Sequence, residues 1–379
     1  MILLLLAPYA TRGQEIHFCA AHNFMTSTGP ITRLVQEPRG FQAFDAAITW
    51  STSGTEAARI FGGPRLGIGI SYANLGSCHC IPGSRMGDSF ALYGRINHSL
   101  IKLGAFQAGY NLELGPALMT HPYHRTDNPG NLLYGGPFTI HVKGGFFALV
   151  HITNKLTVEA DVDFRHNSSC RLIVPNAGIN SVNCGIGARY SLGNATLTPG
   201  AHRPEADPLD KKFRVSIFAG GGIHRCMAEF NADLLLPPDQ RQASYTPWFK
   251  GSVGLDAVWR YSRATSSGLQ LEVHYLANTE ALKRSDNKLF GTAEREYSPI
   301  APGVALIQDL YFGSFIAGVG AGLYLYRKVG VHEDHGRSYQ KVWLKYYPPR
   351  LGGFFAGLTL RAHKFNQADY LELTLGKIL

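Results

Sequence analysis

The feature that most limits the fold is an alternation of apolar and charged residues between Thr157 and Leu192. Successive side chains of a β-strand point to opposite faces. One face of a strand at 157–166 would carry Val158, Ala160, Val162 and Phe164, and the other Glu159, Asp161, Asp163 and Arg165. A second alternating segment begins at Asn180. The pattern predicts two strands joined by a loop.

The charged face indicates where such strands reside. A soluble sheet would bury the apolar face in a core, whereas a transmembrane barrel turns it to lipid and keeps the charged face in a polar lumen. Three carboxylates and one arginine within residues 159–165 suit a wet lumen better than the surface of a soluble sandwich. We therefore interpret this region as the wall of a membrane barrel.

Similar segments recur along the whole chain. None of its apolar runs approaches the roughly 18 residues of a membrane helix. Many of the strand-like segments run about ten residues, enough to cross a bilayer at a tilt. They lie near 15–25, 41–51, 65–74, 88–98, 103–114, 138–150, 156–166, 180–192, 213–223, 248–261, 269–277, 303–312, 314–326, 339–347, 353–363 and 369–377.

These segments predict an all-β fold, an antiparallel transmembrane β-barrel of roughly 12–16 strands over residues 14–379. Long polar insertions at 121–134, 194–212, 236–247 and 278–299 are expected to be its extracellular loops. The proline-containing segment 194–212 is also where two domains would divide, with about eight strands on each side, enough for a small barrel. Because the halves show no convincing repeat, one barrel is preferred.

The first 13 residues resemble the end of a secretory signal peptide that lacks its basic beginning, which favours export. A net charge of +9 favours anionic surfaces such as phosphorylated lipid headgroups. No nucleic-acid motif is present, so nucleic acid is not an expected partner. Cys78-His79-Cys80 has no second pair at zinc spacing, and His332–His335 is interpreted as a solvated loop, so no metal site is predicted.

His166 and Ser168 are the candidate catalytic residues. They share a face of the strand, about 7 Å apart at the backbone, so their side chains can meet. A serine deprotonated by a histidine, with a third group holding the imidazole, performs acyl transfer on esters. A histidine among apolar neighbours also needs a polar partner. A pair at the edge of a lipid-facing wall would attack an acyl ester of a lipid.

Two segments carry a family resemblance. His166-Asn-Ser-Ser169 and Pro175-Asn-Ala-Gly-Ile-Asn180 resemble the active-site signature of the outer-membrane lipid A 3-O-deacylases. The chain is most similar to the longer Bacteroidetes branch of acyloxyacyl hydrolases, and segments 41–50, 66–72 and 369–376 also resemble that branch. The resemblance implies a barrel of the bacterial outer membrane whose active site lies on its outer wall.

The resemblance also implies the roles of the site residues. Ser168 would be the nucleophile and His166 the general base, with Asn180 orienting the histidine. Asn176 and Ser169 would stabilise the oxyanion or position the site. The implied partners are lipid A or lipopolysaccharide and the lipid of the outer membrane, and no cofactor is implied.

Two departures from the better-known deacylases bear on activity. They carry a glutamate where this chain has Asn180, and an asparagine where it has Ser169. Asparagine can orient a histidine but supplies no charge to an imidazolium, so turnover is expected to be slow or absent. The leading hypothesis is a lipid A esterase. The alternatives are a non-catalytic barrel, either a channel or a structural protein, and a soluble secreted all-β binding protein.

Overall fold

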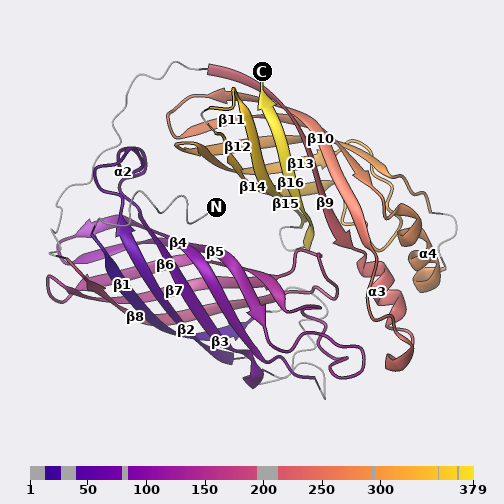
Figure 1. The fold of residues 1–379 in the computed structure, drawn as a ribbon, viewed down its shortest axis with the longest axis horizontal. Coiled ribbons are helices and arrows are strands. Elements are labelled where there is room, and N and C mark those ends of the chain that lie inside the picture. The colour runs from indigo at the N-terminus through magenta and orange to yellow at the C-terminus, as the bar shows by residue number, and fades with distance from the viewer. Residues whose placement is uncertain are drawn as a thin grey trace. The chain divides into compact units, whose positions relative to one another are not determined.

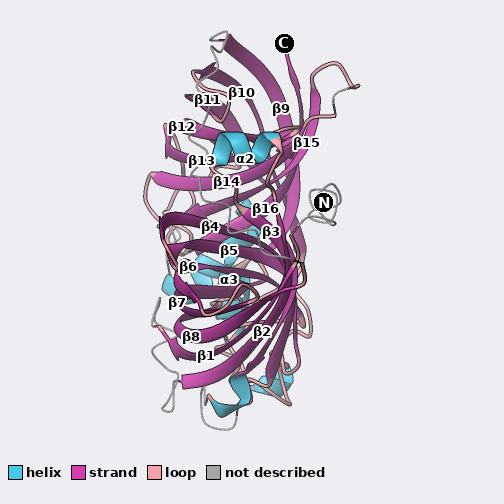
Figure 2. Cartoon of the chain, turned by 90° about the vertical axis from the view of Figure 1, so that its left-hand side faces the viewer, coloured by secondary structure: helices cyan, strands magenta, loops and turns pink. Residues whose placement is uncertain are grey.

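The computed structural model describes residues 13–26, 40–78, 84–193, 212–291, 295–348, 350–364 and 367–379. Their strands form two closed barrels (Figures 1 and 2). Barrel 1 consists of β1 (Glu15–Met25), β2 (Gly40–Ser51), β3 (Arg65–Asn74), β4 (Asp88–Leu103), β5 (Phe106–Met119), β6 (Phe138–His151), β7 (Leu156–Ser168) and β8 (Ile179–Ser191). Barrel 2 consists of β9 (Lys212–Arg225), β10 (Pro247–Arg260), β11 (Thr265–Leu276), β12 (Ile300–Phe312), β13 (Phe315–Tyr324), β14 (Ser338–Tyr346), β15 (Phe354–His363) and β16 (Gln367–Ile378).

The antiparallel barrel fold is confirmed, and each predicted strand segment coincides with one observed strand. The preference for a single barrel is wrong. β8 pairs back with β1, from Glu15↔Ser191 to Met25↔Ser181, and β16 pairs with β9 in the same way. Closure in each half leaves β8 and β9 without free edges, so they cannot pair with each other. The chain therefore forms two compact units.

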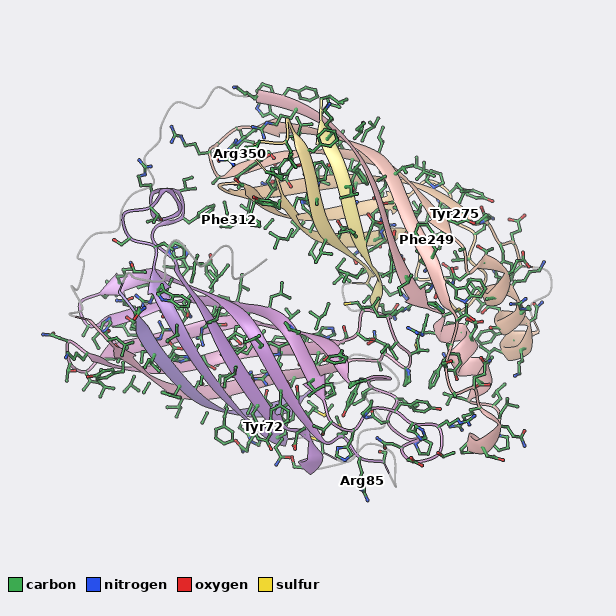
Figure 3. All side chains as sticks on the ribbon, in the orientation of Figure 1. Tyr72, Arg85, Phe249, Tyr275, Phe312 and Arg350 are labelled. Carbon is green, nitrogen blue, oxygen red and sulfur yellow. The ribbon has the colours of Figure 1, made fainter. Side chains whose placement is uncertain are left out.

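The outer walls of both barrels are apolar and the interiors are charged. Outward side chains such as Phe146 and Ile186 in barrel 1 and Leu306 in barrel 2 are about 70% exposed (72%, 71% and 68%). Phe249 and Tyr275 stand on the outer wall of barrel 2 (Figure 3). Such a continuous apolar wall matches transmembrane barrels and contradicts a soluble binding protein.

Ion pairs cross the interior of each barrel. In barrel 1, Lys143 lies 2.7 Å from Asp45 and Arg95 lies 3.3 Å from Glu159, which is 1% exposed. In barrel 2, Lys250 lies 2.7 Å from Asp369, and Lys341 and Arg361 both pair with Glu272. An eight-stranded barrel has an interior about wide enough for side chains to fill. The charged faces predicted from the sequence are therefore the lumen.

The two ends of each barrel differ. Turns at 104–105, 152–155 and 313–314 mark a short-turn end, and α2 (Glu56–Phe61), capped by Thr55, lies at that end of barrel 1. The opposite, long-loop end carries 120–137 and 169–178 in barrel 1. In barrel 2 it carries α3 (Met227–Asp233) and α4 (Thr279–Phe290). Within the described residues, no helix has the length and apolar character needed to cross a membrane.

The predicted extracellular loop 194–212 lies almost entirely outside the described residues. The strands on either side of it are described: β8 ends at the short-turn end of barrel 1, and β9 begins at the short-turn end of barrel 2. The placement of this loop stays a prediction.

Candidate active site

His166 and Ser168 occupy the long-loop end of β7. Arg165 and Asn167 face the lumen, so His166, which lies between them, continues the outward face that begins at Val158. On the neighbouring strand β8, Asn180 is the direct cross-strand partner of His166. Directly opposed residues of antiparallel strands have Cβ atoms about 5 Å apart, within reach of a side-chain hydrogen bond. The strand register thus brings the three candidate residues together.

The three side chains form a hydrogen-bonded chain. Oγ of Ser168 lies 2.9 Å from Nε2 of His166, and Nδ1 of His166 lies 2.7 Å from Oδ1 of Asn180. Because an amide oxygen only accepts, Nδ1 must carry the proton and donate to Asn180. Nε2 is then the unprotonated nitrogen, and it accepts the hydrogen of the Ser168 hydroxyl. This tautomer is the one that a general base requires.

The site is shielded although it belongs to the outward face. Ser168 is 3% exposed and Asn180 is 5% exposed, whereas His166 is half-buried. The residues that end the loop 169–178 lie beside the site, because Asn176 accepts the N–H of Ser169 and Gly178 adjoins His166. Shielding from water strengthens hydrogen bonds and fixed dipoles, which favours stabilisation of a developing charge.

Asn176 fixes the turn that follows the serine. Its Oδ1 accepts hydrogen bonds from the backbone N–H of Ser169 at 2.8 Å and from the Ser169 hydroxyl at 3.0 Å. The amide after a nucleophilic serine often donates to the oxyanion, but here it already donates to Asn176. With its oxygen engaged, Asn176 has only its amide nitrogen to offer as an oxyanion donor. Ser169 acts in this arrangement as a positioning residue.

Gly178 is a site residue that the sequence reasoning missed. Its φ of +75° is in the left-handed region, and its backbone N–H donates to the carbonyl of Leu133 at 2.9 Å. A Cβ at this position would lie 3.1 Å from Cε1 of His166 and 3.5 Å from Cβ of Ser168. The available signal was the Ala-Gly pair in segment 175–180. The packing role of Gly178 depends on Leu133, which lies in a loop 45 residues earlier in the sequence.

The two side chains that hydrogen-bond to His166, those of Ser168 and Asn180, are not carboxylates. Glu159, Asp161 and Asp163 are buried in the lumen, on the opposite face of β7 from His166. Glu159 there pairs with Arg95 and Arg189. The site therefore has the geometry of a serine–histidine hydrolase without the charge of its usual third member.

Barrel 2 lacks the corresponding residues. β15 and β16 are the seventh and eighth strands of barrel 2, as β7 and β8 are of barrel 1. When the lumen-facing Arg165 and Arg361 are aligned, Ala362 takes the place of His166 and Lys364 that of Ser168. The cross-strand partner of Ala362 is Ala368, where barrel 1 has Asn180. A serine–histidine pair at this position is thus present in barrel 1 and not in barrel 2.

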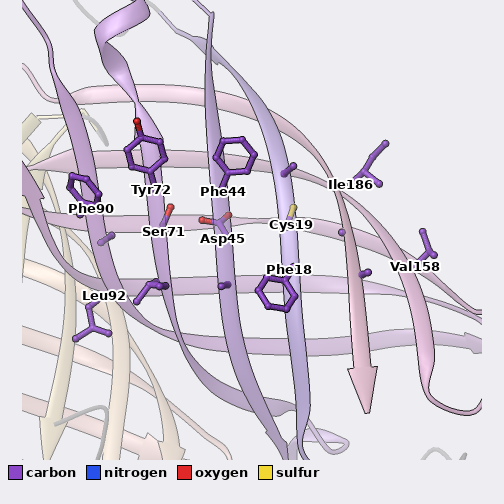
Figure 4. A pocket seen from close by; sticks show the side chains of 16 residues that line it. Phe18, Cys19, Phe44, Asp45, Ser71, Tyr72, Phe90, Leu92, Val158 and Ile186 are labelled. Carbon is purple, nitrogen blue, oxygen red and sulfur yellow. The ribbon is translucent and has the colours of Figure 1, made fainter. Parts of the chain in front are cut away.

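A groove of about 920 Å³ lies on the outer wall of barrel 1, away from Ser168 (Figure 4). The rings of Phe18, Phe44 and Phe90 project along it from β1, β2 and β4. On β7 the groove touches Val158, eight residues and roughly 26 Å along the strand from His166. It is part of the lipid-facing wall and does not belong to the catalytic arrangement.

The segment His332–His335 is not the solvated loop expected from the sequence. Glu333 is 1% exposed, and its carboxylate lies 3.4 Å from Nζ of Lys250. Burial is possible because Lys250 compensates the charge of the carboxylate. No group of three or more potential metal ligands occurs among the residues that the structure describes.

The fold and the site define a membrane β-barrel with a serine–histidine arrangement on its lipid-facing wall. Residues 213–377 match the family model described as acyloxyacyl hydrolase, C-terminal domain. That match lies within barrel 2, so it is barrel 2 that is similar to this family.

Solved structures of outer-membrane proteins are similar to parts of the chain. The outer membrane enzyme PagL matches at 15% identity over 45% of this chain and 97% of its own, with a TM-score of 0.30. Neisserial surface protein A matches at 12% identity over 48% and 97%, also with a TM-score of 0.30. A mutant porin from Rh. blastica matches at 8% identity over 97% and 99%, with a TM-score of 0.18. No curated protein matches the sequence.

Proposed function

We propose that this protein is an outer-membrane esterase that removes an ester-linked acyl chain from lipid A. The observation that carries the proposal is the hydrogen-bonded chain from Ser168 through His166 to Asn180. The similarity of barrel 2 to the acyloxyacyl hydrolase family model supports an acyl hydrolase. The position of the site, on an outward face at the long-loop end, supports a lipid substrate in the outer leaflet.

The geometry supports a two-step acyl transfer. Oγ of Ser168 attacks the ester carbonyl while Nε2 of His166 takes the hydroxyl proton, and the amide nitrogen of Asn176 donates to the oxyanion. His166 then returns the proton to the departing alcohol oxygen, which leaves an acyl-serine. In the second step His166 deprotonates a water molecule that attacks the acyl-serine, and the fatty acid departs as Ser168 regains its proton.

Asn180 makes this mechanism slower than that of a triad with a carboxylate. It holds the tautomer of His166 through the hydrogen bond to Nδ1. It adds no negative charge when His166 becomes an imidazolium, so the transition state loses that stabilisation. A low turnover number is the expected signature of the enzyme.

Release of fatty acid from lipid A by the purified full-length protein in detergent tests the proposal. The native protein should release it, and Ser168→Ala should not. Ser181→Ala is the matched control, because Ser181 lies at the same end of barrel 1 but faces the lumen and donates to Asn23 at 3.3 Å. Equal release by the native protein and Ser168→Ala would refute the proposed nucleophile.

The second candidate is a non-catalytic barrel, and the absence of a carboxylate from the hydrogen-bonded chain at His166 favours it. Of its two forms, a channel is the less compatible with the structure, because ion pairs such as Lys143–Asp45 and Lys250–Asp369 cross the lumens. In planar bilayers the protein should show no conductance steps. Stable open steps together with no release of fatty acid would establish the channel instead.

A further inference from the structure

A pocket at the long-loop end of barrel 2 has more basic than acidic residues in its lining. It has a volume of about 510 Å³ and lies between segments 295–296 and 327–337. Its charged lining residues are Arg295, Arg327, Lys328, Arg337, Glu296 and Asp334. Four positive and two negative side chains leave a net charge of +2 in the pocket.

The two segments are held together by backbone contacts. Tyr297 and Val329 form an antiparallel β-bridge, and the N–H of Ser298 donates to the carbonyl of Lys328 at 2.8 Å. Asp286 of α4 accepts hydrogen bonds from the Tyr297 hydroxyl at 3.0 Å and from the N–H of Val331 at 2.8 Å. The pocket is thus built on a fixed frame, so a ligand would not have to order it.

The carboxylates do not neutralise the arginines. Glu296 pairs with Lys328 at 2.7 Å, and Asp334 accepts the N–H of Gly336 at 3.1 Å. Arg295, Arg327 and Arg337 form no salt bridge with any residue in the described ranges. Like charges gathered without counterions repel one another, and an anion between them would relieve that repulsion.

Arg327 is held in place at the wall of the pocket. Its Nη2 donates to the backbone carbonyl of Glu333 at 2.8 Å, and its guanidinium lies 5.0 Å from the ring centre of Tyr324. These contacts fix the guanidinium. Because Arg327 lines the pocket, they also fix its positive charge there.

We propose that this pocket binds a phosphate group, with Arg295, Arg327 and Arg337 as its donors. Guanidinium groups match the oxygens of phosphate in geometry and charge. The pocket is larger than a phosphate ion requires and can admit a phosphorylated sugar. This site goes beyond the proposed esterase, because it lies on the barrel that lacks the equivalents of His166 and Ser168.

A lipid headgroup is the source of phosphate that the position favours. The long-loop end of an outer-membrane barrel faces the outer leaflet. The exposed face of α4 carries Lys283, Arg284 and Lys288, which extends the basic surface beyond the pocket. The phosphate would bind in the pocket, while the α4 charges would act on the membrane surface only through a field that salt screens.

Binding measurements on the full-length protein test the site. All variants carry Ser168→Ala so that no lipid is consumed. The probes are inorganic phosphate, lipid A with its phosphates, and the same lipid A after their removal, each titrated in about 0.15 M salt to screen distant charges. Arg295→Gln combined with Arg337→Gln removes two charges from the pocket. Lys283→Gln combined with Arg284→Gln removes two charges from α4 and is the matched control.

The pocket variant should bind phosphorylated lipid A at least about tenfold more weakly, as expected when charge-assisted hydrogen bonds are lost. The α4 control should stay within about twofold, because its charges are exposed and screened. Weak competition by inorganic phosphate would support the headgroup as ligand, whereas inorganic phosphate binding as tightly as the lipid would assign the site to free phosphate. Equal weakening in both variants, or undiminished binding of dephosphorylated lipid, would overturn the site. If the protein released no fatty acid from lipid A, these binding results would still test the phosphate site.

Discussion

The Ser168 hydroxyl oxygen lies 2.9 Å from Nε2 of His166, two residues earlier on the same strand. Both residues lie at the end of a strand whose outward face is apolar and whose inward face is charged. A serine so placed can meet an ester at the boundary of the membrane.

Asn180→Asp should accelerate the proposed reaction. The new side chain would add the carboxylate that stabilises an imidazolium, and its absence from serine–histidine triads costs about 10⁴-fold in rate. We expect a gain of about tenfold or more in kcat for release of fatty acid. Asn180→Ala, which removes the hydrogen bond to Nδ1, should lower kcat. Equal or slower turnover by the aspartate variant would show that Asn180 is not the third member of the site.

Gly178→Ala should impair the site through a steric contact. The new Cβ would lie 3.1 Å from Cε1 of His166, closer than ordinary contacts allow. Gly63→Ala is the matched control, because Gly63 has a similar φ of +77° and no atom within 4 Å of a new Cβ. Both variants should lose about 1 kcal/mol of unfolding free energy from the left-handed backbone.

Turnover separates these two glycine variants. Release of fatty acid should fall only in Gly178→Ala, while both proteins remain folded barrels by their migration on unheated gels. Similar activity of Gly178→Ala and Gly63→Ala would remove Gly178 from the site. Loss of activity in both would attribute the effect to backbone strain in barrel 1 as a whole.

Cys184 tests which face of barrel 1 meets lipid. It is exposed on the outward face of β8. A nitroxide attached to Cys184 in a protein without other cysteines should, in vesicles, collide more often with oxygen than with a water-soluble nickel complex. The control is a label on Ser53→Cys, in an exposed turn of the same barrel, which should show the reverse. A label at 184 that prefers nickel would contradict a lipid-facing wall.

The strands could be predicted because their signal is local. Alternation such as Val158-Glu159-Ala160-Asp161 fixes both the strand and its faces within a few residues. Closure could not be predicted in this way. Whether β8 pairs with β1 or continues to β9 depends on pairing between residues as distant as Glu15 and Ser191. The segment 194–212 pointed to the boundary, but its composition does not reveal which strands close each barrel.

The candidate site could be predicted from the sequence for the same reason, but only in part. His166 and Ser168 share a face by strand geometry alone, and the family signature pointed to Asn180 and Asn176. Gly178 was missed because its contact with His166 depends on how the loop 169–178 folds back. The basic pocket was missed because Arg295 and Arg337 are brought together by the bridge between Tyr297 and Val329. The burial of Glu333 likewise depends on Lys250, 83 residues away.

Ser168 is proposed to be the nucleophile that removes an acyl chain from lipid A. The most direct test is mass spectrometry of lipid A from cells that express the native protein, compared with cells that express Ser168→Ala. With equal amounts of folded protein in the outer membrane, the native form should yield lipid A lacking one acyl chain, and the variant should yield unchanged lipid A. Unchanged lipid A in both, or the same loss in both, would contradict the account.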